Sequence, residues 1–163
     1  MHKQKNILLV EQLNAIDKKI LMLLQSNANL RVKEIAEQIG LSTTPTYERI
    51  KKMEKDGVIQ RYVTLINPDM IDKGLLAYCN VTLKEHSQNT LESFEFEVAK
   101  LNEVMEILCM SGNCDYQLKV ATRDMKSYHN FVMNKLSAIE NIANVQSSFV
   151  MKTVKNETAF HLD

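Results

Sequence analysis

Apolar side chains recur every three or four residues in the first part of the chain. Between residues 13 and 24 the apolar positions are Leu13, Ile16, Ile20, Leu23 and Leu24. This spacing predicts a helix of about three turns that buries one face. Asn14 stands where an N-cap belongs, and Asp17, three residues later, predicts a capping box with it.

Residues 32–39 predict a second, shorter helix. Ile35, Ala36 and Ile39 recur at helical spacing, and we expect them to face inward. Gly40 follows at the position where a left-handed residue commonly ends a helix.

Residues 41–57 predict a third helix that begins with short hydroxyl side chains. Ser42 or Thr44 can act as its N-cap, and Pro45 suits the first turn because its missing N–H is not needed there. Gly57 is expected to end this helix. The positions predicted to face inward are Ile50, Met53 and Tyr47, and those predicted to face outward are Thr43, Thr46, Arg49 and Lys52.

Three short helices, with only GLST between the second and the third, match a helix-turn-helix. The segment VIQRYVTLI, residues 58–66, has the composition of a strand. It predicts the wing that often follows such a motif.

The pattern changes after Asn67-Pro68, which marks a turn. Alternating polarity then predicts strands, and helical spacing predicts helices. The predicted strands are residues 75–85, 104–111, 116–122 and 145–154, and the predicted helices are residues 89–102 and 125–139. This βαββαβ order is the split pattern of a ferredoxin-like domain.

The predicted fold class is therefore α+β, with two domains. Residues 1–66 form a winged helix-turn-helix, and residues 67–163 form the ferredoxin-like domain, which begins with a hinge at about 67–74. A split sheet of this kind carries helices on one face only. We expect its other face, predicted to be rich in Leu, Val, Met and Tyr, to be covered by a second copy of the chain in a homodimer or larger oligomer.

The composition is that of an ordinary globular protein, with 163 residues, 45% hydrophobic and 25% charged. No run approaches the roughly 18 apolar residues of a membrane helix, and no signal-peptide pattern is present. We therefore expect a cytoplasmic protein without a membrane partner. Cys79, Cys109 and Cys114 form no C-x-x-C pair, so the sequence suggests neither a disulfide framework nor a zinc site.

The net charge of zero conceals an asymmetry between the two halves. Residues 1–66 contain 11 basic and 7 acidic residues, a net charge of +4, and residues 67–163 contain 9 and 13, a net charge of −4. A basic face on a small domain is typical of proteins that bind a polyanion. Ordinary scatter of charge along the chain explains the same numbers.

Four segments occur in a characteristic order, namely LNAIDKKILMLLQSNA, EIAEQIGLS, ERIKKMEKDGVIQRY and SGNCDYQLKV. Together they resemble the Lrp/AsnC, or feast/famine, family of bacterial and archaeal transcription regulators. The resemblance covers residues 13 to about 154. It implies a winged helix-turn-helix that binds double-stranded DNA, a hinge strand, and a βαββαβ module. That module dimerises, often assembles dimers into an octamer, and commonly binds an amino-acid effector between dimers.

The chain departs from the family pattern at three positions and in one segment. Asn29 replaces a usual Arg, and Arg31 replaces a Ser or Thr cap, which affects the start of the second helix. Asn14 stands where Asp is usual, a neutral exchange for an N-cap. The segment IENIANVQ lacks the Pro-Gly that often precedes the last strand, so the approach to that strand differs.

The resemblance assigns DNA contacts to the third helix, because the N-terminal residues of a recognition helix meet base edges. The small polar residues there are Ser42, Thr43, Thr44 and Thr46. Arg49 is expected to contact guanine or phosphate, Lys51 and Lys52 to neutralise phosphates, and Arg61 to reach the backbone from the wing. Each basic residue is alternatively a solvated surface charge, and those near the helix C-terminus also complement its dipole.

SGNCDY has two explanations. Gly112 and Asn113 are residues that a tight hairpin turn demands. Under the family resemblance, Gly112 also exposes backbone N–H groups to an effector carboxylate, and Asp115 offers a carboxylate to the effector ammonium. The further effector candidates are Met110, Tyr116, Thr122, Arg123 and Asp124, of which the last three are expected to act across the interface. Asp124 equally suits the N-cap of the following helix.

The enzyme hypothesis has little support, because the sequence contains no Gly-rich phosphate loop, H-E-x-x-H motif or nucleophile elbow. We expect no enzymatic activity, cofactor or metal. The competing hypothesis is an amino-acid sensor or interaction protein without DNA binding. That hypothesis predicts loss of the basic recognition face, whereas Arg49, Lys51 and Lys52 are all present.

Overall fold

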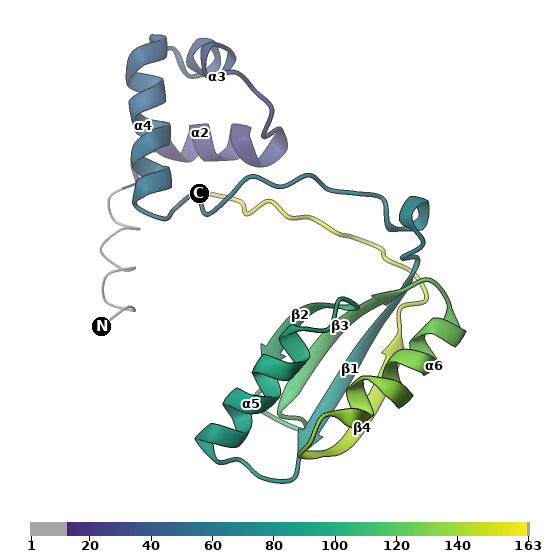
Figure 1. Cartoon of the computed structure of the whole chain (residues 1–163). Coiled ribbons are helices and arrows are strands. Elements are labelled where there is room, and N and C mark those ends of the chain that lie inside the picture. The colour runs from purple at the N-terminus through teal and green to yellow at the C-terminus, as the bar shows by residue number, and fades with distance from the viewer. Residues whose placement is uncertain (1–12, 163) are drawn as a thin grey trace. The chain divides into compact units, whose positions relative to one another are not determined.

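The computed structural model describes residues 13–162, which form two compact units (Figure 1). The helical unit runs to Leu65 and also includes the segment from Lys155 onward, and the sheet unit spans Ile66–Val154. The end of the chain differs from the predicted division. Phe160 exchanges hydrogen bonds with Gln25, and Leu162 packs against the core of the helical unit.

The helical unit contains α2 (Ala15–Ser26), α3 (Val32–Ile39) and α4 (Thr43–Lys55). Its core is built by Ile20, Ile35, Ile50 and Met53, which are the apolar positions that helical spacing predicts. Gly40 and Gly57 follow α3 and α4 with positive φ of 73° and 76°. The three predicted helices are therefore confirmed.

The capping box at the start of α2 is also confirmed. Oδ1 of Asn14 accepts from the backbone N–H groups of Ile16 and Asp17, at 2.9 and 3.0 Å. In return, Oδ2 of Asp17 accepts from the backbone N–H of Asn14 at 3.3 Å. At the start of α3, Arg31 supplies no side-chain cap, but its own N–H donates to Oε2 of Glu34 at 2.6 Å.

The predicted strand of the wing is wrong. Residues 60–67 have an extended, exposed course without a strand partner in the part of the chain that the structure describes. A strand is held by hydrogen bonds to a neighbour, so strand-like composition alone does not make one.

The sheet unit follows the predicted βαββαβ order. Its elements are η1 (Pro68–Ile71), β1 (Leu75–Leu83), α5 (Gln88–Ala99), β2 (Val104–Cys109), β3 (Tyr116–Thr122), α6 (Met125–Asn134), η2 (Leu136–Ala138) and β4 (Ile142–Phe149). The strand order in space is β2-β3-β1-β4, and the neighbouring strands are antiparallel.

The last strand and the last helix differ from their predicted bounds. β4 begins three residues earlier and ends five residues earlier than predicted, because its extent is set by the ladder with β1, from Leu83↔Ile142 to Ala77↔Phe149. The predicted helix at 125–139 ends as α6 at Asn134 and continues as the short 3₁₀ turn η2. The difference in β4 depends on tertiary pairing, which periodicity does not report.

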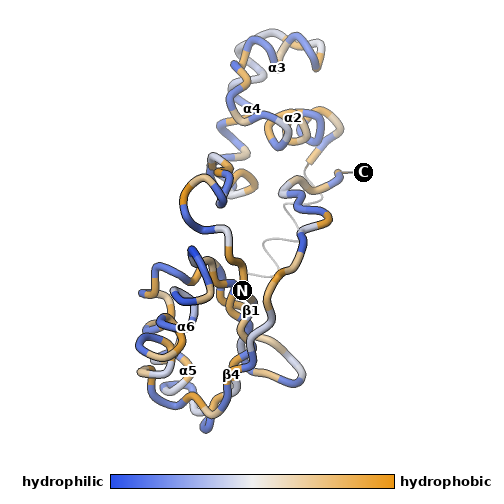
Figure 2. Tube along the Cα trace, turned by 90° about the vertical axis from the view of Figure 1, so that its right-hand side faces the viewer, coloured by the Kyte–Doolittle hydropathy of each residue, from blue (hydrophilic) through white to orange (hydrophobic). Residues whose placement is uncertain are grey.

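α5 and α6 cover the same face of the sheet (Figure 1). Along both helices, hydrophilic and hydrophobic residues alternate in the way that a half-buried helix requires (Figure 2). Facing them, Ala77, Cys79, Val81 and Leu83 alternate along β1 and are at most 3% exposed. These residues form the main core together with buried side chains of β3, α5 and α6.

The opposite, open face of the sheet is less apolar than predicted. By strand alternation it carries Leu76 and Tyr78, but also Asn80 and Gln117. Nε2 of Gln117 donates to Oδ1 of Asn80 at 3.0 Å. Most of the Leu and Val residues of the strands face the helices instead.

Candidate nucleic-acid interface and effector site

α4 has one buried face and one exposed face. Thr46, Ile50 and Met53 are at most 5% exposed. The side chains of Thr44, Glu48, Lys51 and Lys52 lie on the opposite, exposed side. The accessible face of α4 is therefore short-chained and polar at its start and basic further along.

Thr46 was predicted to contact DNA, and the structure contradicts this. The residue is 0% exposed, and its Oγ1 donates to the backbone carbonyl of Ser42 at 2.9 Å. A hydroxyl that donates to the carbonyl four residues earlier lies against the backbone of its own helix, so it does not project toward a ligand. Ser42 itself occupies the N-cap position, exposed and without a side-chain capping bond.

Tyr47 was predicted to face inward, and this is also wrong, because it is 50% exposed. Nζ of Lys51, one turn later, lies 5.6 Å from the centre of its ring. The apolar character of tyrosine suggested a core position. The signal that could have corrected this is that Ile50 and Met53 already define the buried face, and Tyr47 is rotated by about 90° from the middle of that face.

Arg49 points along the side of α4 toward α2. Its Nη1 lies 2.8 Å from Oδ1 of Asp17, and the exposed fractions of the two side chains are 34% and 12%. Sequence reasoning placed Arg49 on DNA from its position on the recognition helix, and it missed the ion pair because the partner is 32 residues away in the chain. The ion pair occupies part of the guanidinium and fixes the direction of the side chain.

Lys51 and Lys52 differ in their surroundings. Lys51 donates to Oε2 of Glu54 at 2.6 Å, which raises the pKa of the lysine. Glu54 also accepts from the hydroxyl of Tyr62 at 3.0 Å, and burial together with this bond raises the pKa of Tyr62 to about 12. Lys52 is exposed, and Arg61 is exposed in the irregular segment that follows α4.

The turn between β2 and β3 is closed by a bond from the N–H of Met110 to the carbonyl of Asp115, at 2.8 Å. Gly112 and Asn113 lie exposed at its tip, where Gly112 has φ of 141° and open space on the side where a Cβ would project. Asp115 accepts from the backbone N–H of Leu83 through Oδ2 and pairs with Nε2 of His86 through Oδ1. Both oxygens of the predicted ammonium ligand therefore already have a partner.

Tyr116 and Thr122, both predicted effector contacts, are each 2% exposed. The ring of Tyr116 packs 4.8 Å from that of Phe94, and its hydroxyl donates to Oε1 of Glu95 at 2.7 Å. Tyr116 thus belongs to the core beneath α5, and its assignment to a ligand pocket was wrong. Thr122 has its hydroxyl 3.4 Å from the backbone carbonyl of Asp124 and offers little surface to a ligand.

Asp124 is the N-cap of α6. Its Oδ1 accepts from the backbone N–H of Ser127 at 2.7 Å, and Nε of Arg123 donates to its Oδ2 at 3.1 Å. The bonds from Ser127 come first in lowering the pKa of Asp124 to about 2, and the bond from Arg123 adds to them. The capping alternative for Asp124 is therefore confirmed. Arg123 remains the most exposed of the predicted contacts in this loop, with 63% of its side chain accessible.

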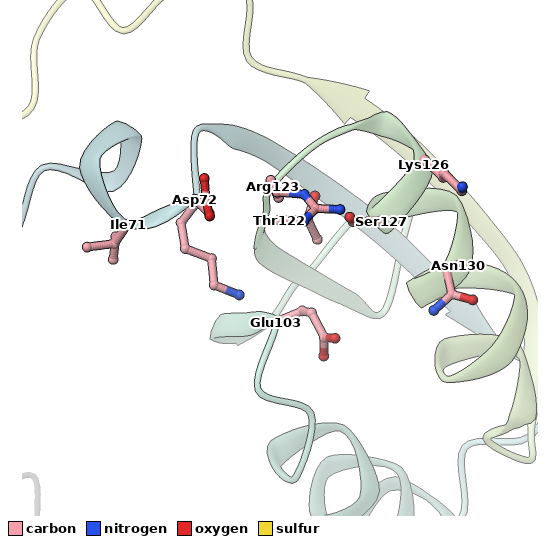
Figure 3. A pocket seen from close by; sticks show the side chains of 9 residues that line it. Ile71, Asp72, Glu103, Thr122, Arg123, Lys126, Ser127 and Asn130 are labelled. Carbon is pink, nitrogen blue, oxygen red and sulfur yellow. The ribbon is translucent and has the colours of Figure 1, made fainter.

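A cavity of about 590 Å³ opens beside the start of α6 (Figure 3). It is lined by Ile71, Asp72, Lys73, Glu103, Thr122, Arg123, Lys126, Ser127 and Asn130. Oε1 of Glu103 accepts from Lys135 at 2.6 Å, whereas its buried Oε2 has no partner among the described residues. Sequence reasoning missed Lys73, Glu103 and Lys126 because they belong to three separate segments that come together only in the fold.

The two parts of the predicted effector site do not meet within one chain. The turn 110–115 lies before β3 and the loop 121–125 at its other end. Six residue steps of a strand separate these ends by about 20 Å. One amino acid cannot contact both parts of the same protomer.

Within residues 13–162 no helix has the length and apolar character to cross a bilayer. The same part of the chain has no group of three His, Cys, Asp or Glu side chains placed to hold a metal ion.

A three-helix unit with an exposed basic helix, joined to a one-sided antiparallel sheet, is the architecture of a two-domain DNA-binding regulator. Comparison with protein families supports this description for both parts of the chain. Residues 13–60 match the family of winged helix-turn-helix DNA-binding domains, and residues 76–160 match the Lrp/AsnC ligand binding domain. The chain belongs to the Lrp/AsnC family and is a DNA-binding transcriptional regulator that an effector modulates.

Individual relatives agree with this. The chain is 33% identical to the DNA-binding transcriptional activator DecR of Escherichia coli over 93% of its own length and 99% of that protein. It is 34% identical to the leucine-responsive regulatory protein of Salmonella typhimurium, over 89% and 88% of the two chains. The first relative is thus named as a transcriptional activator and the second as a regulatory protein.

Solved structures give the same fold. A transcriptional regulator of Neisseria meningitidis, in complex with L-Met, matches with a TM-score of 0.89 and 32% identity over 93% of this chain and 98% of that chain. An AsnC family regulator of Agrobacterium tumefaciens matches with a TM-score of 0.87 and 37% identity, over 91% and 97%.

Proposed function

We propose that the regulator contacts DNA through the exposed face of α4 and that its effector is an amino acid bound between protomers. The accessible, basic face of α4 is the observation that supports the first part. The separation of the two effector segments at opposite ends of β3 supports the second.

In the proposed interface, Ser42, Thr43 and Thr44 approach base edges, because small side chains at the start of a recognition helix let its backbone come close to the groove. Tyr47 joins them, since it is half exposed on the same helix. The phosphates are contacted by Lys51, Lys52 and Arg61.

Lys52→Ala tests this interface. The lysine is exposed on α4, so its loss should weaken binding to every duplex and reduce the slope of log affinity against log salt by about 0.9. Lys100→Ala is a matched control, because it removes an exposed lysine from the sheet unit, where Lys100 pairs with Glu97. Equal salt slopes for Lys52→Ala and the unmodified protein would contradict the proposed contact.

For the effector, the turn 110–115 of one protomer and the loop 121–125 of another would recognise the two charges of an amino acid. Gly112 leaves backbone N–H groups accessible, and Arg123 projects a largely exposed guanidinium suited to a carboxylate. Since Asp115 is already bonded twice, it would orient the turn as well as accept from the ammonium. The Neisseria relative solved with L-Met is consistent with this ligand class.

A thermal-shift screen against the twenty amino acids tests the effector. A ligand that binds only the folded protein raises the melting temperature, by an amount that grows with the ratio of its concentration to its Kd. The shift should disappear in Arg123→Ala and persist in Lys33→Ala, which removes an exposed charge from α3 of the helical unit. No shift with any amino acid at millimolar concentration would count against an amino-acid effector.

The open face of the sheet is the proposed dimer interface, with assembly of four dimers into an octamer as a further step. An unpaired sheet face that carries Leu76 and Tyr78 gains from a second copy against it. A dimer would present two copies of α4 to half-sites about 34 Å apart. Tyr78→Asp should lower the mass measured by light scattering, whereas an unchanged mass would place the interface elsewhere.

A further inference from the structure

Asp17 connects two helices of the helical unit through one carboxylate. Its Oδ1 lies 2.8 Å from Nη1 of Arg49 on α4. Its Oδ2 accepts from the backbone N–H of Asn14 at 3.3 Å and so caps α2. With only 8% of the residue exposed, Asp17 holds the start of α2 and the side of α4 at the same time.

Arg49 therefore has a different environment from the lysines of α4. A planar guanidinium bonds a carboxylate in a fixed direction, unlike the flexible ammonium of lysine. This bond turns Arg49 away from the middle of the exposed face, where Glu48 and Lys52 lie. Asp17 itself is unsuited to DNA, because it is nearly buried and phosphates repel its charge.

We propose that Arg49 is a positioning residue that acts through Asp17 to fix the angle of α4, and that other side chains of α4 make the contacts with DNA. This inference rests on the proposed use of α4 in recognition. The helix has 13 residues and is about 20 Å long. A tilt of about 10° around its centre moves either end by about 2 Å, which is enough to break the hydrogen bonds that a recognition helix makes.

The test is a double-mutant cycle with Asp17→Asn, Arg49→Met and the double variant. The probe is a duplex that the unmodified protein selects from a random-sequence pool, with affinity measured at several salt concentrations. We expect each single variant to bind about tenfold more weakly, the double variant to lose little more, and the salt slope to stay unchanged. A salt slope about 0.9 smaller for Arg49→Met, or unweakened binding by Asp17→Asn, would overturn the proposal.

Lys52→Met is the matched control, since it removes a cation of similar length from the same helix. Its loss of affinity should add to that of Asp17→Asn and should reduce the salt slope. Binding is measured well below the lowest melting temperature, so that unfolding does not mimic a loss of contact.

The melting temperatures supply a readout that needs no DNA. If Asp17 and Arg49 are joined, the decreases caused by the two single substitutions, each about 5 °C, should not add in the double variant. Additive decreases would overturn the connection between the two residues even if the unmodified protein selects a duplex. Failure to select any duplex would instead count against the proposed DNA interface of α4.

Discussion

Asp115 ties the turn between β2 and β3 to the end of β1, because its Oδ2 accepts from the backbone N–H of Leu83 at 2.7 Å. The turn is thus anchored to a strand that is not its sequence neighbour. His86, three residues after Leu83, holds the other oxygen of the same carboxylate at 3.0 Å. The carboxylate of Asp115 thus adds to the backbone bonds that Asp115 makes with Met110 and Val81 in holding the exposed segment 110–115.

Asp115→Asn should make the fold less sensitive to acid. The bonds from Leu83 and then from His86 lower the pKa of Asp115 below its ordinary value. A carboxyl with a lowered pKa in the folded state stabilises the protein above about pH 4, and this contribution is lost as the pH falls through the lowered pKa. We expect Asp115→Asn to cost about 1 kcal/mol at pH 7 and much less near pH 2.

Urea unfolding at the two pH values measures this difference. Glu106→Gln is the control, since it removes an exposed carboxylate from the same sheet without removing a bond to Leu83. An equal cost of Asp115→Asn at both pH values would show that the anchoring bond does not need the charge.

Thr46→Val should reduce stability without affecting the salt dependence of DNA binding. The substitution preserves shape but removes the bond to the carbonyl of Ser42, in a residue that is 0% exposed. The expected cost is about 1 kcal/mol in the free energy of unfolding. Thr44→Val, at an exposed position of the same helix, should leave stability nearly unchanged and weaken binding to the selected duplex. The reverse pattern would restore Thr46 as a DNA contact.

Asp124→Ala should lower the melting temperature. Asp124→Asn should lower it much less, because asparagine is an equally good N-cap. The cap bond to the N–H of Ser127 explains the difference. Since the pKa of Asp124 is lowered to about 2, the stabilising effect of its charge should be complete above about pH 4, decrease as the pH falls further, and be lost below the lowered pKa. An effector whose thermal shift is lost in Asp124→Asn would show that this carboxylate also binds ligand.

Gln25→Ala should release the segment that follows β4. The amide of Gln25 accepts from the N–H of Phe160 at 2.7 Å and donates to its carbonyl at 3.0 Å. Both bonds are exposed, so the expected loss is about 1 kcal/mol, and the N–H of Phe160 should exchange with solvent several times faster. Hydrogen exchange with residue resolution measures this, and Gln38→Ala on α3 is the control. An unchanged exchange rate would mean that Leu162 alone holds the segment.

The sequence predicted those features of the fold that depend on local pattern. The capping box of Asn14 and Asp17, the glycines after α3 and α4, and the βαββαβ order all follow from spacing within a few residues. The wing strand failed because a strand needs a partner, and the bounds of β4 failed because the ladder with β1 determines where it ends.

The candidate sites were less predictable, because they depend on which way each side chain turns. Thr46 and Tyr47 exchange their predicted orientations, although they are adjacent on the same helix. The partner of Arg49 lies on another helix, and the lining of the cavity beside α6 comes from three segments. The periodicity within one helix or strand contains no information about contacts with side chains of another element.

The pairing of Gln25 with Phe160 also limits how the two units can be exchanged between relatives. A crossover at the hinge near residue 66 would join the α2 of one parent to the segment after β4 of the other. The side-chain amide of Gln25 and the backbone groups of Phe160 would then form their two hydrogen bonds only if these groups occupy the same positions in both parents. Functional chimeras of this family should therefore be more frequent when residues from Lys155 onward are inherited together with α2.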